Sequence, residues 1–295
     1  MKDLNSTPLW TALITPFKDN GEVDYDTLKR LVTEQDKAGN GILVLGSTGE
    51  SLNIDNEERQ EIFKFVTDLN PEVPLMAGIG GINLKTTMKD LLFLESLNYD
   101  AYLMVTPLYA KPGSIGQTNW FKTLMDHSTR PCMLYNVPGR SGVSLSLKTV
   151  ESLKDHKNLW SIKEASGNPL EFQKYSSISP SISVFSGDDA MLPEYVPHNC
   201  KGLVSVAANC WPKETHLYTK LSLSNELGED HQWTKWSNDL FLASNPIPVK
   251  QLMAHNNTIS TGICREPLTH LDMENIDQLI ESDKEVKNWF NTQKL

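Results

Sequence analysis

An α/β fold, built as a closed (β/α)8 TIM barrel with a helical appendage at its C-terminus, is the architecture that this sequence predicts. Eight short apolar runs recur along the first two thirds of the 295-residue chain. Segments with helical periodicity lie between these runs, and such an alternation is typical of parallel sheets. The length also fits, because a barrel of this type commonly takes roughly 250 residues.

The eight apolar runs have the length and the nearly continuous apolarity of strands that are buried on both faces. They cover residues 11–15, 42–45, 75–79, 101–105, 132–135, 160–162, 182–185 and 203–206. A doubly wound open sheet also alternates strands and helices, but it seldom sustains eight units at such regular spacing. We therefore expect the strands to close into a barrel.

Capping residues mark the ends of the first helices. Asp24 precedes a stripe of apolar positions, and Gly39 stands where a left-handed residue commonly ends a helix. Asp55 and Glu58 have the spacing of a capping box, and the helix that follows them is stopped by Pro71. Further helical patterns cover residues 84–97, 120–125, 147–153 and 170–175.

The last third of the chain has a different pattern, since no apolar run typical of a strand follows Val206. Its apolar positions have helical spacing and include Trp233, Leu240, Leu252 and Ile276. We expect residues 1–225 to form the barrel that carries the active site. Residues 226–295 are expected to form a helical region that packs on the barrel.

The composition argues against nucleic acid and membranes as partners. The chain has 37 acidic and 27 basic residues, a net charge of −10, and no run of lysine and arginine that could form a basic patch. The first residues contain no apolar segment of a signal peptide, and nowhere do about 18 apolar residues run together as a membrane span requires. We therefore expect a soluble, cytoplasmic protein.

Cysteine, histidine and glycine spacing indicates no metal and no nucleotide cofactor. The four cysteines lie far apart, which favours free thiols in a reducing compartment. The seven histidines form neither H-x-x-x-H nor H-E-x-x-H, so no metal site is predicted. The glycines at 78–81 fail the dinucleotide fingerprint because Asn83 stands where its third glycine belongs, and the chain lacks a Walker loop.

Polar residues follow five of the apolar runs, at the strand ends where a parallel barrel carries its active site. The segments are G-S-T-G-E-S at 46–51, T-P-L-Y at 106–109, Y-N-V-P-G-R-S-G at 135–142, K-E-A-S at 163–166 and S-G-D-D at 186–189. Because these ends meet at one mouth, we expect their side chains to lie together.

Lys163 is the most informative of these residues, since it places an ammonium directly on an apolar strand. Burial disfavours the charged form and would lower the lysine pKa, which provides the free amine needed to attack a ketone. The alternative is a structural lysine that pairs with Glu164 or with another carboxylate at the barrel rim. The residue alone does not decide between these interpretations.

The other candidates also have ordinary alternatives. The turn at 46–49 offers free amides and two hydroxyls, which could hold a carboxylate or simply cap a helix. Tyr135 could relay protons or only pack, and Arg140 could clamp a substrate carboxylate or be solvated. Their convergence on one barrel mouth favours the functional interpretation of the whole set.

Taken together, five motifs make the chain similar to the dihydrodipicolinate synthase / N-acetylneuraminate lyase family. They are G-S-T-G-E-S at 46–51, Y-N-V-P-x-R-x-G at 135–142, I-K-E-A at 162–165, S-G-D-D at 186–189 and N-P-I-P-V-K at 245–250. The motifs occur in family order over nearly the whole chain. The set is therefore specific, although each motif is weak alone.

The resemblance implies a lyase of the aldolase type that uses no cofactor. Lys163 is expected to form a Schiff base with pyruvate, whose carboxylate is held by Ser47 and Thr48 with their backbone amides. Tyr135 is expected to pass protons. It would be joined through Ser47 to Tyr109, which in this family reaches in from the neighbouring subunit.

The second substrate implied by the resemblance is aspartate semialdehyde. Synthases of the family use an arginine at the place of Arg140 for the carboxylate of this substrate, and Gly187 and Val204 are also expected to bind substrate. The product would be a hydroxylated tetrahydrodipicolinate, in the first committed step of diaminopimelate and lysine biosynthesis. A neuraminate lyase or 2-keto-3-deoxy sugar-acid aldolase of the same family is the alternative. A non-catalytic barrel that binds a keto acid is an alternative of another class.

Two residues depart from the family pattern. Ser47 replaces the threonine usual in the synthases and matches the N-acetylneuraminate lyases, but it keeps the hydroxyl. Leu108 replaces a frequent tyrosine, which bears on regulation more than on chemistry. The family also implies a homotetramer, arranged as a pair of tight dimers.

Feedback by lysine is a further property of some family members. The positions that would line the lysine cleft are Ser51, Leu52, Asn56, Arg59, Ile82, Thr86 and Leu108. Sensitive enzymes tend to have an acidic group at the place of Thr86, so a bound lysine here would bury its ammonium without a partner and would meet a cation in Arg59. We therefore expect this chain to be insensitive to lysine at roughly millimolar concentration.

Overall fold

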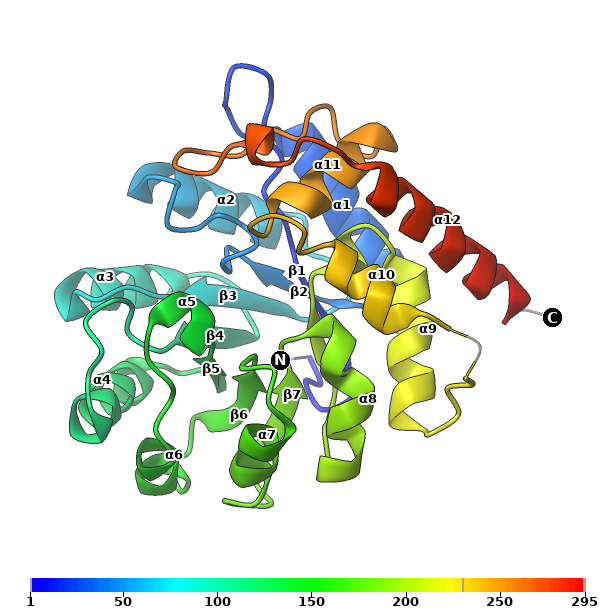
Figure 1. Ribbon diagram of the computed structural model, residues 1–295. Helices are drawn as coiled ribbons and strands as arrows, with labels where there is room; N and C mark the ends of the chain where they lie inside the picture. Colours follow the sequence, from blue (N-terminus) through cyan, green and yellow to red (C-terminus); the bar gives the residue numbers. More distant parts are fainter. Residues whose placement is uncertain (1, 230, 294–295) are drawn as a thin grey trace.

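The computed structural model describes residues 2–229 and 231–293. Its centre is a closed barrel of parallel strands that follow one another around the barrel in chain order, from β1 to β8 (Figure 1). Helices surround the barrel. The predicted (β/α)8 barrel with a C-terminal helical appendage is confirmed. Met1 and Leu295, the outer limits of the two predicted regions, lie outside the described residues.

The strands lie where the apolar runs predicted them, with small differences at their ends. They are β1 (Leu9–Ala12), β2 (Gly41–Val44), β3 (Leu75–Ile79), β4 (Ala101–Val105), β5 (Cys132–Asn136), β6 (Leu159–Glu164), β7 (Ser183–Ser186) and β8 (Leu203–Ser205). Both ends of β3 and β4 are as predicted. Continuous apolarity therefore located every strand of the barrel.

The first strand differs most from its prediction, because it starts at Leu9 and ends at Ala12 instead of covering residues 11–15. It pairs with β2 on one side and with β8 on the other. Two residues after its end, the amide of Ile14 donates to the side-chain oxygen of Asn209 at 2.9 Å. A side chain from a distant part of the sequence thus takes the place of a neighbouring strand, and the apolar run could not reveal it.

The helices alternate with the strands and continue beyond the barrel. They are α1 (Tyr25–Ala38), α2 (Asn56–Asp68), α3 (Leu84–Glu95), α4 (Ser114–His127), α5 (Pro138–Ser141), α6 (Leu147–Leu153), α7 (Pro169–Ser176), α8 (Leu192–Tyr195), α9 (Pro212–Leu223), α10 (Trp233–Asp239), α11 (Ile247–His255) and α12 (Asp277–Thr292). Short 3-10 turns lie at η1 (Asp189–Met191), η2 (Val196–His198), η3 (Ala207–Asn209) and η4 (His270–Asp272).

The predicted caps of α1 and α2 form, with one difference. Asp24 accepts the amide of Thr27, and Gly39 ends α1 in the left-handed conformation with a φ of 76°. Asp55 accepts the amide of Glu58 at 2.9 Å. The reciprocal half of the predicted capping box is not made, because the Glu58 carboxylate lies 2.7 Å from the guanidinium of Arg265.

Two apolar cores follow from the alternation of side chains along the strands. The inner core fills the barrel and includes Trp10, Leu43, Met76, Leu103, Met133, Phe185 and Val204. The outer core lies between strands and helices and includes Ile42, Val44, Leu134, Ile162 and Val184. In the paired register Tyr135 stands opposite Lys163, and Lys163 opposite Phe185. Lys163 therefore shares the inward register of two inner-core residues.

Of the C-terminal helices, α10 and α12 lie beside α9, whereas α11 packs against α12 and η3 (Figure 1). The ring of Trp233 in α10 stacks on Tyr218 of α9 with centroids 4.1 Å apart, and Trp289 of α12 approaches the same indole at 5.5 Å. These contacts join the region after residue 226 to the barrel. The division into 1–225 and 226–295 stays a prediction.

Two further sequence expectations concern the whole chain. All four cysteines are free thiols, as expected. Within residues 2–229 and 231–293 no helix is long and apolar enough to cross a membrane.

Candidate active site

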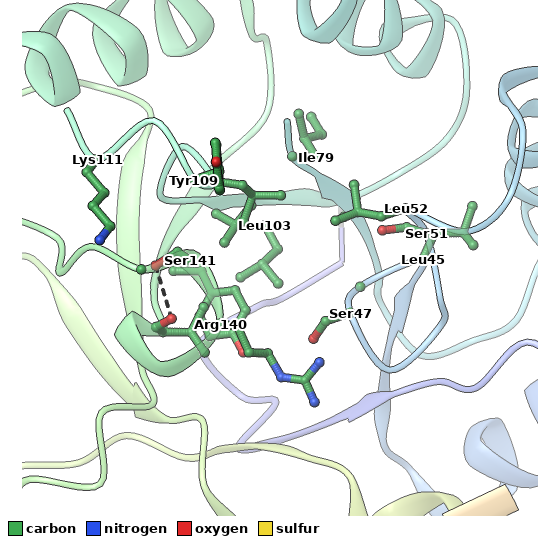
Figure 2. A pocket seen from close by; sticks show the side chains of 18 residues that line it. Leu45, Ser47, Ser51, Leu52, Ile79, Leu103, Tyr109, Lys111, Arg140 and Ser141 are labelled. Carbon is green, nitrogen blue, oxygen red and sulfur yellow. Dashed lines mark hydrogen bonds between the residues drawn. The ribbon is translucent and has the colours of Figure 1, made fainter. Parts of the chain in front are cut away.

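A cavity of about 620 Å³ opens where strands β2 to β5 end (Figure 2). The turn after β2 lines it with Leu45, Gly46, Ser47, Ser51 and Leu52, and the end of β3 with Gly78, Ile79 and Gly80. The other wall consists of Leu103, Val105, Leu108, Tyr109, Lys111, Tyr135, Val137, Arg140, Ser141 and Gly142. Ser47, Tyr109, Tyr135 and Arg140 of the predicted site thus share one cavity.

The turn after β2 has an unusual backbone. Leu45 and Glu50 have positive φ angles of 53° and 56°, although neither is a glycine. Each such residue costs about 1–2 kcal/mol relative to an ordinary conformation. The amides of Ser47 and Thr48 donate to no acceptor among the residues that the structure describes. Two consecutive free amides suit an anion such as a carboxylate.

Glycines allow this turn to pack against its neighbours. A Cβ atom at Gly78 of β3 would lie 2.3 Å from the carbonyl oxygen of Leu45, which is an impossible contact. A Cβ atom at Gly49 would lie 3.0 Å from the carbonyl oxygen of Leu13. Only glycine at position 78 therefore lets the turn lie so close to the barrel.

Asn245 connects two of the predicted substrate-binding residues. Its side-chain amide donates to the Thr48 hydroxyl at 2.9 Å, and its backbone carbonyl accepts from the Arg140 guanidinium at 3.2 Å. Figure 2 shows the Arg140 guanidinium and the Ser47 hydroxyl extending into the same part of the cavity. Arg140 forms no ion pair with a described carboxylate, so its charge is available to an anionic ligand.

A buried ion pair anchors the other end of the turn. The Glu50 carboxylate lies 2.7 Å from the ammonium of Lys250 in α11, and both side chains are fully buried. The second oxygen of Glu50 accepts the backbone amide of Arg265 at 2.7 Å. The C-terminal region thus holds the turn at Thr48 and at Glu50.

Lys163 lies at the end of β6 and is almost completely buried, with 5% of its surface exposed. Its ammonium is 4.3 Å from the centre of the Tyr135 ring, which lines the cavity. A Cβ atom at Gly187 would lie 2.7 Å from Cε of Lys163, so the glycine makes room for the lysine stem. Lys163 does not line the cavity itself but contacts its wall through Tyr135.

The structural alternative for Lys163, an ion pair with Glu164, is wrong. Glu164 accepts from the side-chain amide of Asn136 at 2.6 Å and from the backbone amide of Ser166 at 2.7 Å. Consecutive residues of a strand point to opposite faces, and Glu164 therefore lies away from Lys163. Among the described residues Lys163 forms no ion pair with any carboxylate.

Two aspartates follow β7, and the first of them, Asp188, feels the charge of Lys163. Burial raises the pKa of Asp188, although the amide of Ala190 and the charge of Lys163 partly oppose this effect. Burial raises the pKa of Asp189 to about 6 in spite of hydrogen bonds from Ser205 and from two backbone amides. The charge of Lys163 thus acts on Asp188, although the two side chains form no ion pair in the described part of the chain.

Tyr109 lies in a different environment from the other predicted residues. Its side chain is 88% exposed, and its φ angle of 61° is left-handed. Its amide donates to the carbonyl of Ser141 at 3.0 Å. In the described part of the chain, no hydrogen bond joins the hydroxyls of Tyr109, Ser47 and Tyr135 to one another.

The remaining predicted residues do not line the cavity. Thr48 is buried beneath Asn245, and Gly187 contacts Lys163. Val204 lies in the inner core of the barrel with Tyr135 and Phe185. Over the described ranges no group of three or more His, Cys, Asp or Glu residues could hold a metal ion.

Sequence reasoning did not identify the roles of Glu50, Lys250 and Asn245. All three stand in motifs that the sequence presents, at 46–51 and 245–250. A usable signal was present. The first motif has a single acidic residue, Glu50, and the second a single basic residue, Lys250, and both stand among small or apolar residues. Charges in such surroundings are rarely buried without a partner.

Comparison with known proteins agrees with this geometry. The model of the dihydrodipicolinate synthetase family matches residues 5–285. A 4-hydroxy-tetrahydrodipicolinate synthase of Francisella philomiragia is 44% identical over 291 residues, which cover 98% of both chains. The synthase of Wolbachia pipientis subsp. Culex pipiens is 42% identical over 97% of this chain and 98% of its own.

Solved structures of the same family superpose closely. The 4-hydroxy-tetrahydrodipicolinate synthase of Methylacidiphilum fumariolicum SolV has a TM-score of 0.91 at 28% identity, with 97% of both chains covered. The enzyme of Cyanidioschyzon merolae, solved with lysine bound, has a TM-score of 0.90 at 28% identity and covers 97% of this chain and 99% of its own. The chain belongs to the dihydrodipicolinate synthetase family, as its sequence motifs predicted.

Proposed function

We propose that this chain condenses pyruvate with L-aspartate 4-semialdehyde to 4-hydroxy-tetrahydrodipicolinate, through a Schiff base on Lys163. It is a lyase that acts in diaminopimelate and lysine biosynthesis, as the names of its relatives indicate. One observation carries the covalent mechanism. Lys163 is buried, has no carboxylate partner among the described residues and lies against the Tyr135 ring at the cavity wall.

The proposed reaction proceeds through an imine and an enamine on Lys163. The Lys163 amine attacks the keto carbon of pyruvate and water leaves, which forms the imine. Loss of a methyl proton gives an enamine, and its carbon attacks the aldehyde of the semialdehyde. The semialdehyde amine then attacks the imine carbon and expels Lys163, which closes the ring. In this proposal Tyr135 moves the protons, which is supported by its contact with Lys163.

The two substrate carboxylates have separate partners in this proposal. The free amides of Ser47 and Thr48, with the two hydroxyls, hold the carboxylate of pyruvate. Arg140 holds the carboxylate of the semialdehyde across the cavity. Sugar-acid aldolases of the family generally lack this arginine, so Arg140 and the named relatives favour the synthase over a neuraminate lyase or sugar-acid aldolase.

Trapping with borohydride tests the covalent step. Pyruvate with borohydride should attach a reduced three-carbon adduct to Lys163 and abolish activity, because only an imine at that amine is reducible. Peptide mass analysis reads the position of the label. Lys250, which is also fully buried, serves as the internal control and should stay unlabelled. A label elsewhere, or none, would remove the Schiff-base assignment and favour a keto-acid-binding barrel.

Three further properties belong to the same proposal. The enzyme needs no cofactor, since the imine on Lys163 supplies the electron sink for deprotonation. It assembles as a homotetramer, a pair of dimers in which Tyr109 completes the site of the neighbouring subunit. It is cytoplasmic, which is supported by its four free cysteines.

A further inference from the structure

The Glu50–Lys250 ion pair is the most deeply buried one among the described residues. Both side chains are 0% exposed, whereas every other ion pair in this part of the chain leaves some surface of each partner in contact with solvent. Removing two charges from water is costly unless their geometry is good and their other hydrogen bonds are satisfied. A buried ion pair often adds little to the stability of a protein. The role of this pair therefore follows from its position.

The contacts of the pair join three distant segments of the chain. Lys250 Nζ lies 2.7 Å from one oxygen of Glu50 and 4.2 Å from the centre of the Phe17 ring. The amide of Arg265 donates to the other oxygen of Glu50, and the Arg265 guanidinium lies 4.7 Å from the centre of the same Phe17 ring. Glu50 is therefore fixed from two sides by residues of the C-terminal region.

The segment that is fixed in this way is the strained turn between β2 and α2. Glu50 and Leu45, at the two ends of the turn, both have left-handed backbone conformations. Such conformations persist only where the surrounding contacts determine them, and they concentrate at functional sites. Between the two residues lie Ser47 and Thr48, whose free amides point to an anion site.

We propose that Lys250 is a positioning residue for the pyruvate carboxylate. Through its buried ion pair with Glu50 it holds the turn in the conformation that presents the amides of Ser47 and Thr48. Lys250 does not line the cavity, so it acts on the substrate only through the turn. The inference rests on the proposed function, because it assigns the turn to the pyruvate carboxylate.

The test replaces Lys250 by methionine, which keeps the length of the side chain and removes its charge. The KM for pyruvate should rise about ten-fold or more, while the KM for the semialdehyde changes less than about two-fold. At saturating pyruvate, borohydride should still label Lys163 completely, because the amine itself is intact.

Leu252→Ala is the matched control for a loss of stability alone. Leu252 lies in the same helix and is fully buried, but it belongs to the outer apolar core and contacts no part of the turn through a polar group. This variant should lower the Tm and leave both KM values within about two-fold of the wild type.

A second variant covers the case in which Lys250→Met fails to fold because Glu50 is left unpaired. Glu50→Gln combined with Lys250→Met removes both charges, so no unpaired charge is buried. It should fold and show the same selective rise in the KM for pyruvate. The proposal is overturned if a folded variant keeps the wild-type KM for pyruvate, if both KM values rise together, or if the neutral double variant does not fold. Failure of the wild type to form the borohydride adduct would instead overturn the proposed function.

Discussion

Two segments at the mouth of the barrel adopt left-handed backbone conformations, and they are held in different ways. The turn from Leu45 to Glu50 is fixed by a buried ion pair and by the hydrogen bond between Asn245 and Thr48. The loop that contains Tyr109 and Lys111 has φ angles of 61° and 48°, and the Tyr109 side chain is 88% exposed.

The difference indicates which parts of the site one chain completes by itself. The turn after β2 is held at Thr48 and at Glu50 by residues of the C-terminal region of the same chain, so its conformation is set when that region folds onto the barrel. The Tyr109 loop is held through its backbone, by the bond to Ser141, and leaves a large aromatic ring in solvent. This exposure supports the proposal that Tyr109 acts at the site of a neighbouring subunit.

The largest expected effect is on the free energy of unfolding, and it should differ between the two segments. Glu50→Ala should lower the free energy of unfolding by about 3–5 kcal/mol, because it leaves the Lys250 ammonium buried without its carboxylate. Tyr109→Ala in the exposed loop should change it by less than about 1 kcal/mol. Urea unfolding of the two variants measures both values. Equal losses would mean that the Tyr109 loop has a structural role comparable with that of the turn.

A second prediction contrasts Glu50 with Asp189, a buried carboxylate that has no cation beside it. Burial raises the pKa of Asp189 from 3.8 to about 6, so the folded state favours the protonated form. Its contribution to stability is complete below pH 4 and is lost as the pH rises toward and through 6. The loss is on the order of 3 kcal/mol, from a shift of roughly two pKa units.

Asp189→Asn tests this effect, because asparagine does not titrate. Relative to the wild type, the variant should gain stability between pH 4 and pH 7, and the gain should follow the titration of Asp189. Urea unfolding at several pH values gives the difference, in which the other carboxylates cancel. A difference that is constant with pH would show that Asp189 is ionised throughout this range.

A third prediction compares the two cations that line the cavity. Arg140→Ala should reduce kcat/KM for the semialdehyde about ten- to a hundred-fold, since losing a charged hydrogen bond costs roughly 1.5–3 kcal/mol. Imine formation with pyruvate should remain nearly normal. Lys111→Ala is the control, because Lys111 belongs to the exposed loop and makes no polar contact with another described residue. If Arg140→Ala instead prevents trapping of pyruvate, the arginine is structural.

The smallest expected effect concerns lysine, which should not inhibit this enzyme at roughly millimolar concentration. The structure changes one reason for this expectation. Arg59 is not a free cation, because its guanidinium forms an ion pair with Asp90 of α3. The position of Thr86 still lacks the carboxylate that would balance the ligand's ammonium. Titration of lysine into the coupled assay measures the inhibition. Half-inhibition below millimolar concentration would show that lysine binds in a way that these contacts do not explain.

The sequence by itself determined the barrel and the positions of its chemistry. Strands that are buried on both faces consist of continuous apolar runs, so the polar side chains of such a sheet are found at the strand ends. The strand pattern alone therefore places Lys163, Tyr135 and Arg140 at one mouth of the barrel. The family motifs added what strand patterns cannot contain, namely the choice of substrates.

Only the tertiary structure decided which distant side chains meet. The end of β1 depends on Asn209, and the partner of Glu58 is Arg265 rather than its own helix end. The ion pair between Glu50 and Lys250 joins residues 200 positions apart. Local sequence patterns report the period and the ends of an element. They cannot report these contacts, because a long-range pair is fixed by how the C-terminal helices pack on the barrel.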